Sequence, residues 1–304
     1  MTMKTNEVYN MECAEGMKQL PDESVDLIYA DMMYDELEFN WIDECFRVLK
    51  SDGSIYVQTD QRSVAQVKLY MDKMFKFRNW IVWCYRGIAR KSNCYQSNHD
   101  DILFYTKSDS FTWNNPTQPP SDSTMKRWGK YADENGNIPK DKLTPSMRKK
   151  GKTMSIRNTR MRDWWDDISV VGFKEAPKGK QHIFQKPIEL IKRIILASSN
   201  PQDVVLDPFM GCGTTAIASI ETNRNFIGFE IDENNYKICK DRIGTAHQIT
   251  SANADPTGHL IGIKRKPCEV SQIPNGTSLN SDIMRNFSQE AKNLKSPETM
   301  EVRR

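Results

Sequence analysis

The 304-residue sequence lacks the features that mark membrane-spanning and disulfide-stabilised proteins. No uninterrupted apolar stretch approaches the roughly 20 residues that a membrane helix requires. The N-terminal segment has no apolar core of the kind found in signal peptides. The seven cysteines are scattered and include no C-x-x-C pair, so they indicate neither a disulfide framework nor a zinc site. These absences predict a cytoplasmic protein with reduced thiols and no membrane partner.

A strong excess of one charge is also missing. The formal net charge is only +3, which by itself does not indicate a nucleic-acid partner. Residues 147–165, "MRKKGKTMSIRNTRMRDWW", are nevertheless strongly basic and end in two tryptophans. Most basic runs are solvated loops, but basic residues beside aromatic rings suit phosphate contacts and base stacking. We therefore predict nucleic-acid contacts from seven residues: Arg148, Lys149, Lys150, Lys152, Arg157, Arg160 and Arg162.

Hydrophobic periodicity is regular in two parts of the chain. Residues 8–107 alternate helical patterns with short β-branched and aromatic runs at 25–30, 54–59, 80–85 and 102–106. After residue 186 an apolar helix precedes strands at 203–207 and 225–230, with a last helix over about 233–243. Strands that alternate with helices predict an α/β fold built on a doubly wound, mostly parallel sheet.

Two other stretches lack this periodicity. Residues 108–180 are rich in Pro, Asn, Ser, Lys and Arg, and they are too many for an ordinary loop. We interpret them as an inserted recognition region between two halves of one domain, residues 8–107 and 181–245. Residues 246–304 are polar and are predicted to form a mobile tail.

The stretch "VVLDPFMGCGTTAIASIETNRNFIGFEID" at 204–232 is the most specific. A strand, a glycine-bearing turn and a helix in this order let a ligand approach the backbone closely. An acid, Glu230, ends the next strand about twenty residues later, where it suits the hydroxyls of a ribose. No G-K-[ST] follows the glycines, so a phosphate-binding P-loop is not indicated. The sequence predicts a nucleoside cofactor at this turn.

The segment "LIYADMMYDE" at 27–36 ends another apolar run. Asp31 and Tyr34 could present a carboxylate and a flat ring to one planar ligand. Taken alone, the segment reads as an ordinary strand end.

The order of these motifs resembles the β class of exocyclic-amino DNA methyltransferases. "QKPIELIKRIILASSNPQDVVLDPFMGCGTT" is similar to the cofactor region of that family, and "CAEGMKQLPDESVDLIYADMMY" is similar to its N-terminal D-P-P-Y region. The resemblance implies a Rossmann-like class I fold with circularly permuted motifs, S-adenosylmethionine as cofactor and no metal. It also implies double-stranded DNA as substrate, a homodimer, and a restriction endonuclease as partner.

The resemblance also implies roles for individual residues. Asp31 and the carbonyl of Met32 would accept the two hydrogens of a base amino group, and Tyr34 would stack on a base that has left the duplex. Glu230 would hold the ribose, and Glu12 would lie near the adenine of the cofactor. Residues 185–187 would lie beside its methionine moiety. The full cofactor set is Asp207, Phe209, Gly211, Gly213, Thr214, Glu230, Gln185, Lys186, Pro187 and Glu12.

One departure from the family concerns the catalytic motif, in which Met32 and Met33 replace both prolines of D-P-P-Y. Methionine keeps the carbonyl but adds an N–H group and loosens the backbone, since proline fixes φ and has no N–H. The enzyme could still methylate, use another base or a modified donor, or only bind DNA. Within the family that the chain resembles, an acid at the start of the motif accompanies adenine N6 more often than cytosine N4, so the resemblance favours adenine. RNA and protein glutamine are further substrates within such families, but the basic, aromatic insertion argues against a protein substrate.

Overall fold

The computed structural model describes residues 3–32, 39–85, 93, 95–149, 154–156, 158–170 and 185–252. All of them belong to the first of two compact units, residues 1–260. Five predicted site residues lie outside this part of the chain, as do the side chain of Lys149 and the predicted tail from residue 253 onward. The five are Met33, Tyr34, Lys150, Lys152 and Arg157. No helix in the described ranges combines the length and the apolar character that a membrane crossing demands.

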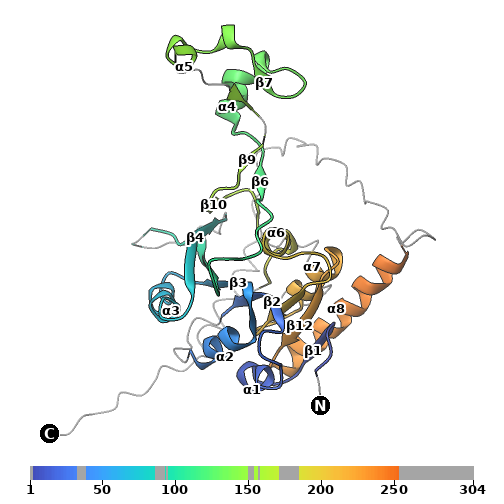
Figure 1. The fold of residues 1–304 in the computed structure, drawn as a ribbon. Helices are drawn as coiled ribbons and strands as arrows, with labels where there is room; N and C mark the ends of the chain where they lie inside the picture. The colour runs from blue at the N-terminus through green and yellow to red at the C-terminus, as the bar shows by residue number, and fades with distance from the viewer. Residues whose placement is uncertain are drawn as a thin grey trace, which may run out of the picture. The chain divides into compact units, whose positions relative to one another are not determined.

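A central sheet organises the described residues, and it has eight strands there (Figure 1). In spatial order they are β1 (Glu7–Tyr9), β12 (Asn225–Phe229), β11 (Val204–Asp207), β2 (Val25–Asp31), β3 (Leu49–Thr59), β5 (His99–Thr106), β4 (Lys76–Cys84) and β10 (Trp164–Trp165). The first five run parallel to one another, and β10 runs parallel to β4. β5 runs antiparallel to both of its neighbours. The predicted doubly wound, mostly parallel α/β sheet is confirmed.

Both faces of the sheet are buried, which explains why its strands read as continuous apolar runs. Successive residues of β2 point to opposite faces. Ile28 and Ala30 pack in the cluster that includes the helices after β1, β2 and β3, whereas Leu27 and Tyr29 pack in the cluster that includes the helix after residue 187. The helices of the two clusters are α1 (Cys13–Met17), α2 (Asn40–Val48) and α3 (Val64–Met71) on the first face, and α6 (Ile188–Ser198) and α7 (Thr214–Glu221) on the second.

The last helix, α8, differs from its predicted length. It extends over Glu233–Ala252, past the predicted end near residue 243 and past residue 246, where the polar tail was expected to begin. Cys239 and Ile243 bury its first half against Val8, Phe226 and Ala216. The apolar pattern that predicted the helix covers only this packed half, so the polar second half gave no such signal.

The insertion forms small elements with a core of their own. Trp128, Ile138 and Leu143 are buried together there. The elements are β6 (Thr117–Gln118), α4 (Asp122–Trp128), a 3₁₀ turn (Gly129–Tyr131), β7 (Asn137–Ile138), a second 3₁₀ turn (Lys140–Lys142), α5 (Pro145–Lys149), β8 (Met154–Ser155) and β9 (Thr159–Arg160). β6 pairs with β9 and β7 pairs with β8. The chain then returns to the central sheet as β10, within the stretch interpreted as the insertion.

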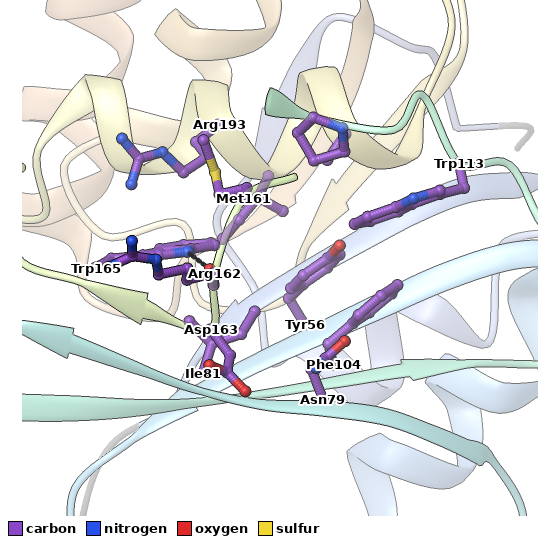
Figure 2. Close-up of a pocket in the computed structure, with 13 residues that line it drawn as sticks. Tyr56, Asn79, Ile81, Phe104, Trp113, Met161, Arg162, Asp163, Trp165 and Arg193 are labelled. Carbon is purple, nitrogen blue, oxygen red and sulfur yellow. Dashed lines mark hydrogen bonds between the residues drawn. The ribbon is translucent and has the colours of Figure 1, made fainter. Parts of the chain in front are cut away.

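The two connections between insertion and sheet meet at one aromatic cluster, which surrounds a cavity of about 70 Å³ (Figure 2). Trp113 of the outgoing connection stacks on Phe104, at 5.6 Å between ring centroids, and Phe104 stacks on Tyr56 at 4.4 Å. The guanidinium of Arg193 on α6 lies over the ring of Trp165 in the returning connection, with its Cζ 5.0 Å from the centroid of that ring. Stacked rings and a cation–π contact therefore attach both connections to the domain.

The packing of α1 against β12 generates a stability prediction. A Cβ at Gly16 would lie 2.2 Å from Cε1 of the fully buried Phe229 ring, whereas a Cβ at Gly244 in α8 would meet nothing within 4 Å. We expect Gly16→Ala to lower the free energy of unfolding by about 1–3 kcal/mol through overpacking. Gly244→Ala, the matched control, should raise it by roughly 0.5–1 kcal/mol, because alanine favours the helix. Urea denaturation measures both, and a neutral Gly16→Ala would contradict the packing.

Candidate active site

Three acidic residues lie at one edge of the sheet. Asp31 ends β2, Asp207 ends β11, and Glu230 directly follows β12. These three strands are neighbours and run parallel, so their carboxyl ends meet at the same edge. The negative charges of Asp31 and Glu230 both act on Asp207, as their proximity requires. The sequence placed these acids at three separate strand ends, and the sheet brings them together.

The glycine turn follows Asp207 and requires both of its glycines. Gly211 has φ +56° and Gly213 has φ +88°, a region that residues with a side chain rarely adopt. A Cβ at Gly213 would lie 2.6 Å from Sγ of Cys239, whereas at Gly211 the nearest atom would be 3.9 Å away. Gly213 therefore serves the packing of α7 against α8, and Gly211 leaves open space in which a ligand can approach the backbone.

Asp207 is buried and closes the base of this turn. Its Oδ1 accepts a hydrogen bond from the Phe209 amide at 2.9 Å, and its Oδ2 accepts one from the Thr215 hydroxyl at 2.5 Å. Burial raises the pKa of Asp207 to about 7, although both hydrogen bonds oppose the shift. Asp207 therefore fixes the shape of the turn from inside, where it is 2% exposed.

Phe209 and Thr214, two further predicted cofactor residues, are also positioned by packing. Phe209 contacts Trp41 edge to face, with the ring centroids 5.0 Å apart, and Thr214 is the buried first residue of α7. Cys212 is buried between them in sequence and contacts Arg242, which donates to its carbonyl at 2.6 Å. The Cys212 side chain is buried, which fits a packing role.

Glu230 holds the turn from the side of β12. Its two carboxylate oxygens accept hydrogen bonds from the amides of Gly211, at 2.7 Å, and Asp232, at 2.8 Å. A carboxylate has about four lone-pair sites, so capacity remains for the hydroxyls of a sugar. This geometry fits the ribose-binding role that the sequence predicted.

Glu12 has a local role that its family resemblance did not indicate. It is the N-cap of α1, and its carboxylate accepts hydrogen bonds from the amides of Ala14, at 2.9 Å, and Glu15, at 2.7 Å. Burial raises the pKa of Glu12 and these hydrogen bonds lower it, and the net shift of the pKa is downward. The side chain therefore stabilises the first turn of a helix whatever else it contacts.

The motif predicted to be catalytic, residues 31–34 (the catalytic corner), begins at Asp31, and Met32 stands where the family has its first proline. The N–H of Met32 donates to the carbonyl of Gln58 on β3 at 3.2 Å. The Met32 side chain is 2% exposed and belongs to the core cluster. The donor that proline would lack is therefore bonded to the neighbouring strand, and the buried side chain anchors the backbone at this residue.

Lys186 lies against the catalytic corner. Its Nζ is 2.7 Å from Oδ2 of Asp31 and 3.8 Å from Oδ2 of Asp100. Gln185, Lys186 and Pro187 are all buried, and Pro187 stands one position before α6 as its N-cap. The Q-K-P segment was expected beside the cofactor, and the structure brings its lysine to the predicted catalytic aspartate.

A hydrogen-bonded set around Asp100 was missed by sequence reasoning. Asp100 accepts from the Gln58 amide at 2.8 Å and from the Tyr85 hydroxyl at 2.9 Å. Gln58 in turn accepts from the Tyr29 hydroxyl at 2.6 Å. The signal in the sequence was limited to two acids directly before the apolar run at 102–106, Asp100 and Asp101. In the described ranges no group of three His, Cys, Asp or Glu side chains could hold a metal ion.

A hollow of about 450 Å³ opens beside this set, at the ends of β4, β5 and β10. Tyr85, His99 and Trp164 are among its lining residues. Trp164 is 56% exposed, and the hydroxyl of Tyr85 reaches Asp100. The hollow thus offers aromatic side chains to a planar group near the catalytic corner.

The basic residues predicted to contact nucleic acid are spread over several elements. Arg148 on α5, Arg160 on β9 and Arg162 after β9 are all exposed. Their guanidinium groups are accessible to phosphates.

Comparison with known proteins agrees with these features. The family model for DNA methylases matches residues 5–241. The type II methyltransferase M.BamHI of Bacillus amyloliquefaciens is 34% identical over 256 residues, which are 78% of this chain and 56% of that protein. This chain therefore spans little more than half the length of M.BamHI. The DNA adenine methyltransferase YhdJ of Escherichia coli is 32% identical over 270 residues, 80% of this chain and 86% of that protein.

Solved structures show the same fold. The complex of M1.HpyAVI with S-adenosylmethionine has a TM-score of 0.54 at 21% identity, and the match covers 78% of this chain and 98% of that one. The motif resemblance read from the sequence is thereby confirmed at the level of family and fold. The chain belongs to the DNA methylase family, whose members methylate adenine N6 or cytosine N4.

Proposed function

We propose that this chain transfers the methyl group of S-adenosylmethionine to the N6 amino group of adenine in double-stranded DNA. The observation that carries the proposal is the position of Asp31 at the carboxyl end of β2, at the same sheet edge as Asp207 and Glu230. A carboxylate placed there can face both an amino group and a cofactor held by the glycine turn.

The glycine turn fits the nucleoside part of the cofactor. The open space at Gly211 admits a ligand to the backbone, and Glu230 retains acceptor capacity for the ribose hydroxyls. We place the methionine moiety against the Q-K-P segment and the adenine of the cofactor near Glu12. When bound, the cofactor supplies a methyl group on a positively charged sulfur.

Asp31 and Met32 act on the amino group to be methylated. The lone pair of that nitrogen is delocalised into the base, so the nitrogen is a poor nucleophile. Asp31 accepts one amino hydrogen and the carbonyl of Met32 accepts the other, which localises the lone pair and aims it at the methyl carbon. The nitrogen bonds to that carbon as the carbon–sulfur bond breaks, and the nitrogen then releases one proton to Asp31. Tyr34 stacks on the base.

The substrate base must leave the duplex to reach this edge. The hollow lined by Tyr85 and Trp164 suits stacking on an extruded base. Arg148, Arg160 and Arg162 are exposed, and we assign phosphate contacts to them and to the other basic residues predicted from the sequence, Lys149, Lys150, Lys152 and Arg157. The exposure of the three arginines supports duplex DNA as the substrate.

The remaining parts of the proposal rest on the relatives and on the family resemblance. Asp31 at the start of the motif and the name of YhdJ support adenine, and cytosine N4 is the alternative target. The type II methyltransferases among the relatives support a cognate restriction endonuclease. A cytoplasmic location and a homodimer complete the proposal.

The first test concerns the catalytic carboxylate. Asp31→Asn cannot accept the amino hydrogen in the same way, and we expect methylation of unmodified duplex DNA to fall by about 10²-fold or more. Digestion to nucleosides and mass spectrometry should find N6-methyladenine in the wild-type reaction. Asp52→Asn, at an exposed aspartate before the buried part of β3, is the matched control and should keep the wild-type rate.

Each other outcome of that experiment has a defined meaning. N4-methylcytosine would reassign the target base, and a mass increase other than a methyl group would reassign the donor. If the wild-type chain binds cofactor and DNA but modifies neither base, the proposed activity is wrong and a DNA-binding module remains.

The second test concerns the cofactor. Glu230→Gln loses the charge that would hold the ribose hydroxyls and that accepts from the Gly211 amide. Hydrogen bonds to charged groups are strong, so we expect the Kd for S-adenosylmethionine to rise roughly tenfold or more in calorimetric titration. Glu233→Gln, three residues further on, is the control and should bind normally. An unchanged Kd for Glu230→Gln would place the ribose elsewhere.

The third test uses the pH dependence of Asp207. Folded, this carboxyl keeps its proton up to about pH 7, whereas an unfolded aspartate releases it near pH 4. Between these values unfolding releases a proton, so the free energy of unfolding falls as pH rises. Between pH 5 and pH 8 the free energy of unfolding should fall less for Asp207→Asn than for the wild type, by roughly 2–3 kcal/mol. Parallel pH curves from urea denaturation would contradict the raised pKa.

A further inference from the structure

One buried ammonium lies near two carboxylates at the catalytic corner, one of them buried and the other partly buried. Lys186 Nζ is 2.7 Å from Asp31 and 3.8 Å from Asp100, and the side chains of Lys186 and Asp100 are each 10% exposed. Asp31 is 20% exposed. The lysine thus makes a close ion pair with Asp31, and its distance to Asp100 is only about one ångström longer.

Asp100, the second carboxylate, is held in place by hydrogen bonds. Asp100 accepts from Gln58 and Tyr85, and Gln58 is fixed in turn by Tyr29. Gln58, Tyr29 and Asp100 are all at most 7% exposed. Asp100 is therefore a rigid acceptor, whereas the lysine reaches it on a flexible four-carbon stem.

The ion pair with Asp31 competes with the proposed chemistry. Asp31 must accept a hydrogen from the target amino group, and the ammonium of Lys186 is bonded to Oδ2 of the same carboxylate. The other oxygen can still accept, but the ammonium offsets the negative charge that makes a carboxylate a strong acceptor. Removing a buried cation from its partner is strongly unfavourable unless another anion takes it up. Asp100 provides that anion within the same pocket.

We propose that Lys186 is a positioning residue that exchanges between the two carboxylates, pairing with Asp31 before the target amino group binds and with Asp100 afterwards. This inference rests on the proposed methyl transfer and adds two residues to it. The exchange keeps the buried charge paired at each stage, and it restores the full acceptor strength of Asp31 only when an amino group replaces the ammonium. Asp100 acts through Lys186 and does not touch the reacting atoms.

A double-mutant cycle tests the exchange at saturating cofactor and DNA. Asp100→Asn removes the second anion, so the ammonium stays on Asp31, and we expect kcat to fall roughly 10- to 100-fold, the scale of a charged hydrogen bond. Adding Lys186→Met removes the competing cation. The double variant should therefore methylate faster than Asp100→Asn alone, a reversal that mere damage to the pocket would not produce.

Controls separate this effect from loss of structure. Asp101→Asn changes the next residue of β5, whose side chain accepts from the indole of Trp80 and points to the other face, and it should keep the wild-type kcat. Thermal unfolding and the Kd for S-adenosylmethionine check that each variant is folded. A double variant as slow as Asp100→Asn, or slower, overturns the proposal.

Lys186→Arg is a second variant, used also if Asp100→Asn does not fold. Arginine keeps the charge, but its rigid fork can bond both carboxylates at once, so it should hold Asp31 and slow methylation roughly tenfold or more. A wild-type rate for Lys186→Arg would mean that charge alone suffices and would overturn the exchange. If the wild-type chain produces no methylated base, the proposed function itself is wrong. Failure of the exchange can therefore be distinguished from failure of the proposed methyl transfer.

Discussion

The parallel alignment of β12, β11 and β2 is the constraint on which the site depends. It brings Glu230, Asp207 and Asp31, residues up to 199 positions apart in the sequence, to one edge of the sheet. Parallel strands require crossover connections, so a helix follows each of these strands and covers a face. Because both faces are covered, the edge is where a ligand can reach polar groups. The same geometry that buries the core therefore creates the place for the chemistry.

Three carboxylates at one edge repel one another, and the surroundings of each carboxylate offset this repulsion in a different way. Asp207 is buried deepest, and its pKa is raised to about 7. Glu230 is held by two backbone amides, and Asp31 by the ammonium of Lys186. The acid that shapes the turn thus tends toward the neutral form, whereas the two acids proposed to contact ligands have charged or amide partners.

Sequence reasoning predicted what local pattern encodes. The glycine turn, the acids at strand ends and the alternation of strands with helices all follow from residues within a few positions of one another. The direction of β5 and the entry of Trp164 and Trp165 into the sheet do not, since periodicity is the same for parallel and antiparallel pairing. Asp100 was missed because its partners Gln58 and Lys186 are 42 and 86 positions away. Only the tertiary fold brings these partners to the buried acid.

The replacement of the first proline by Met32 disturbs the backbone less in the structure than the sequence suggests. From sequence, losing two prolines removes the fixed φ and adds donors at the point where a carbonyl must be aimed. In the fold, the amide of Met32 joins the ladder to Gln58, and its side chain fills the core. Gln58 is also the residue that orients Asp100. Gln58 therefore bonds both to the backbone of Met32, which follows Asp31, and to the carboxylate of Asp100. The sheet thus holds the backbone at Met32, so the motif can lose its first proline without losing the alignment that the proposed reaction needs.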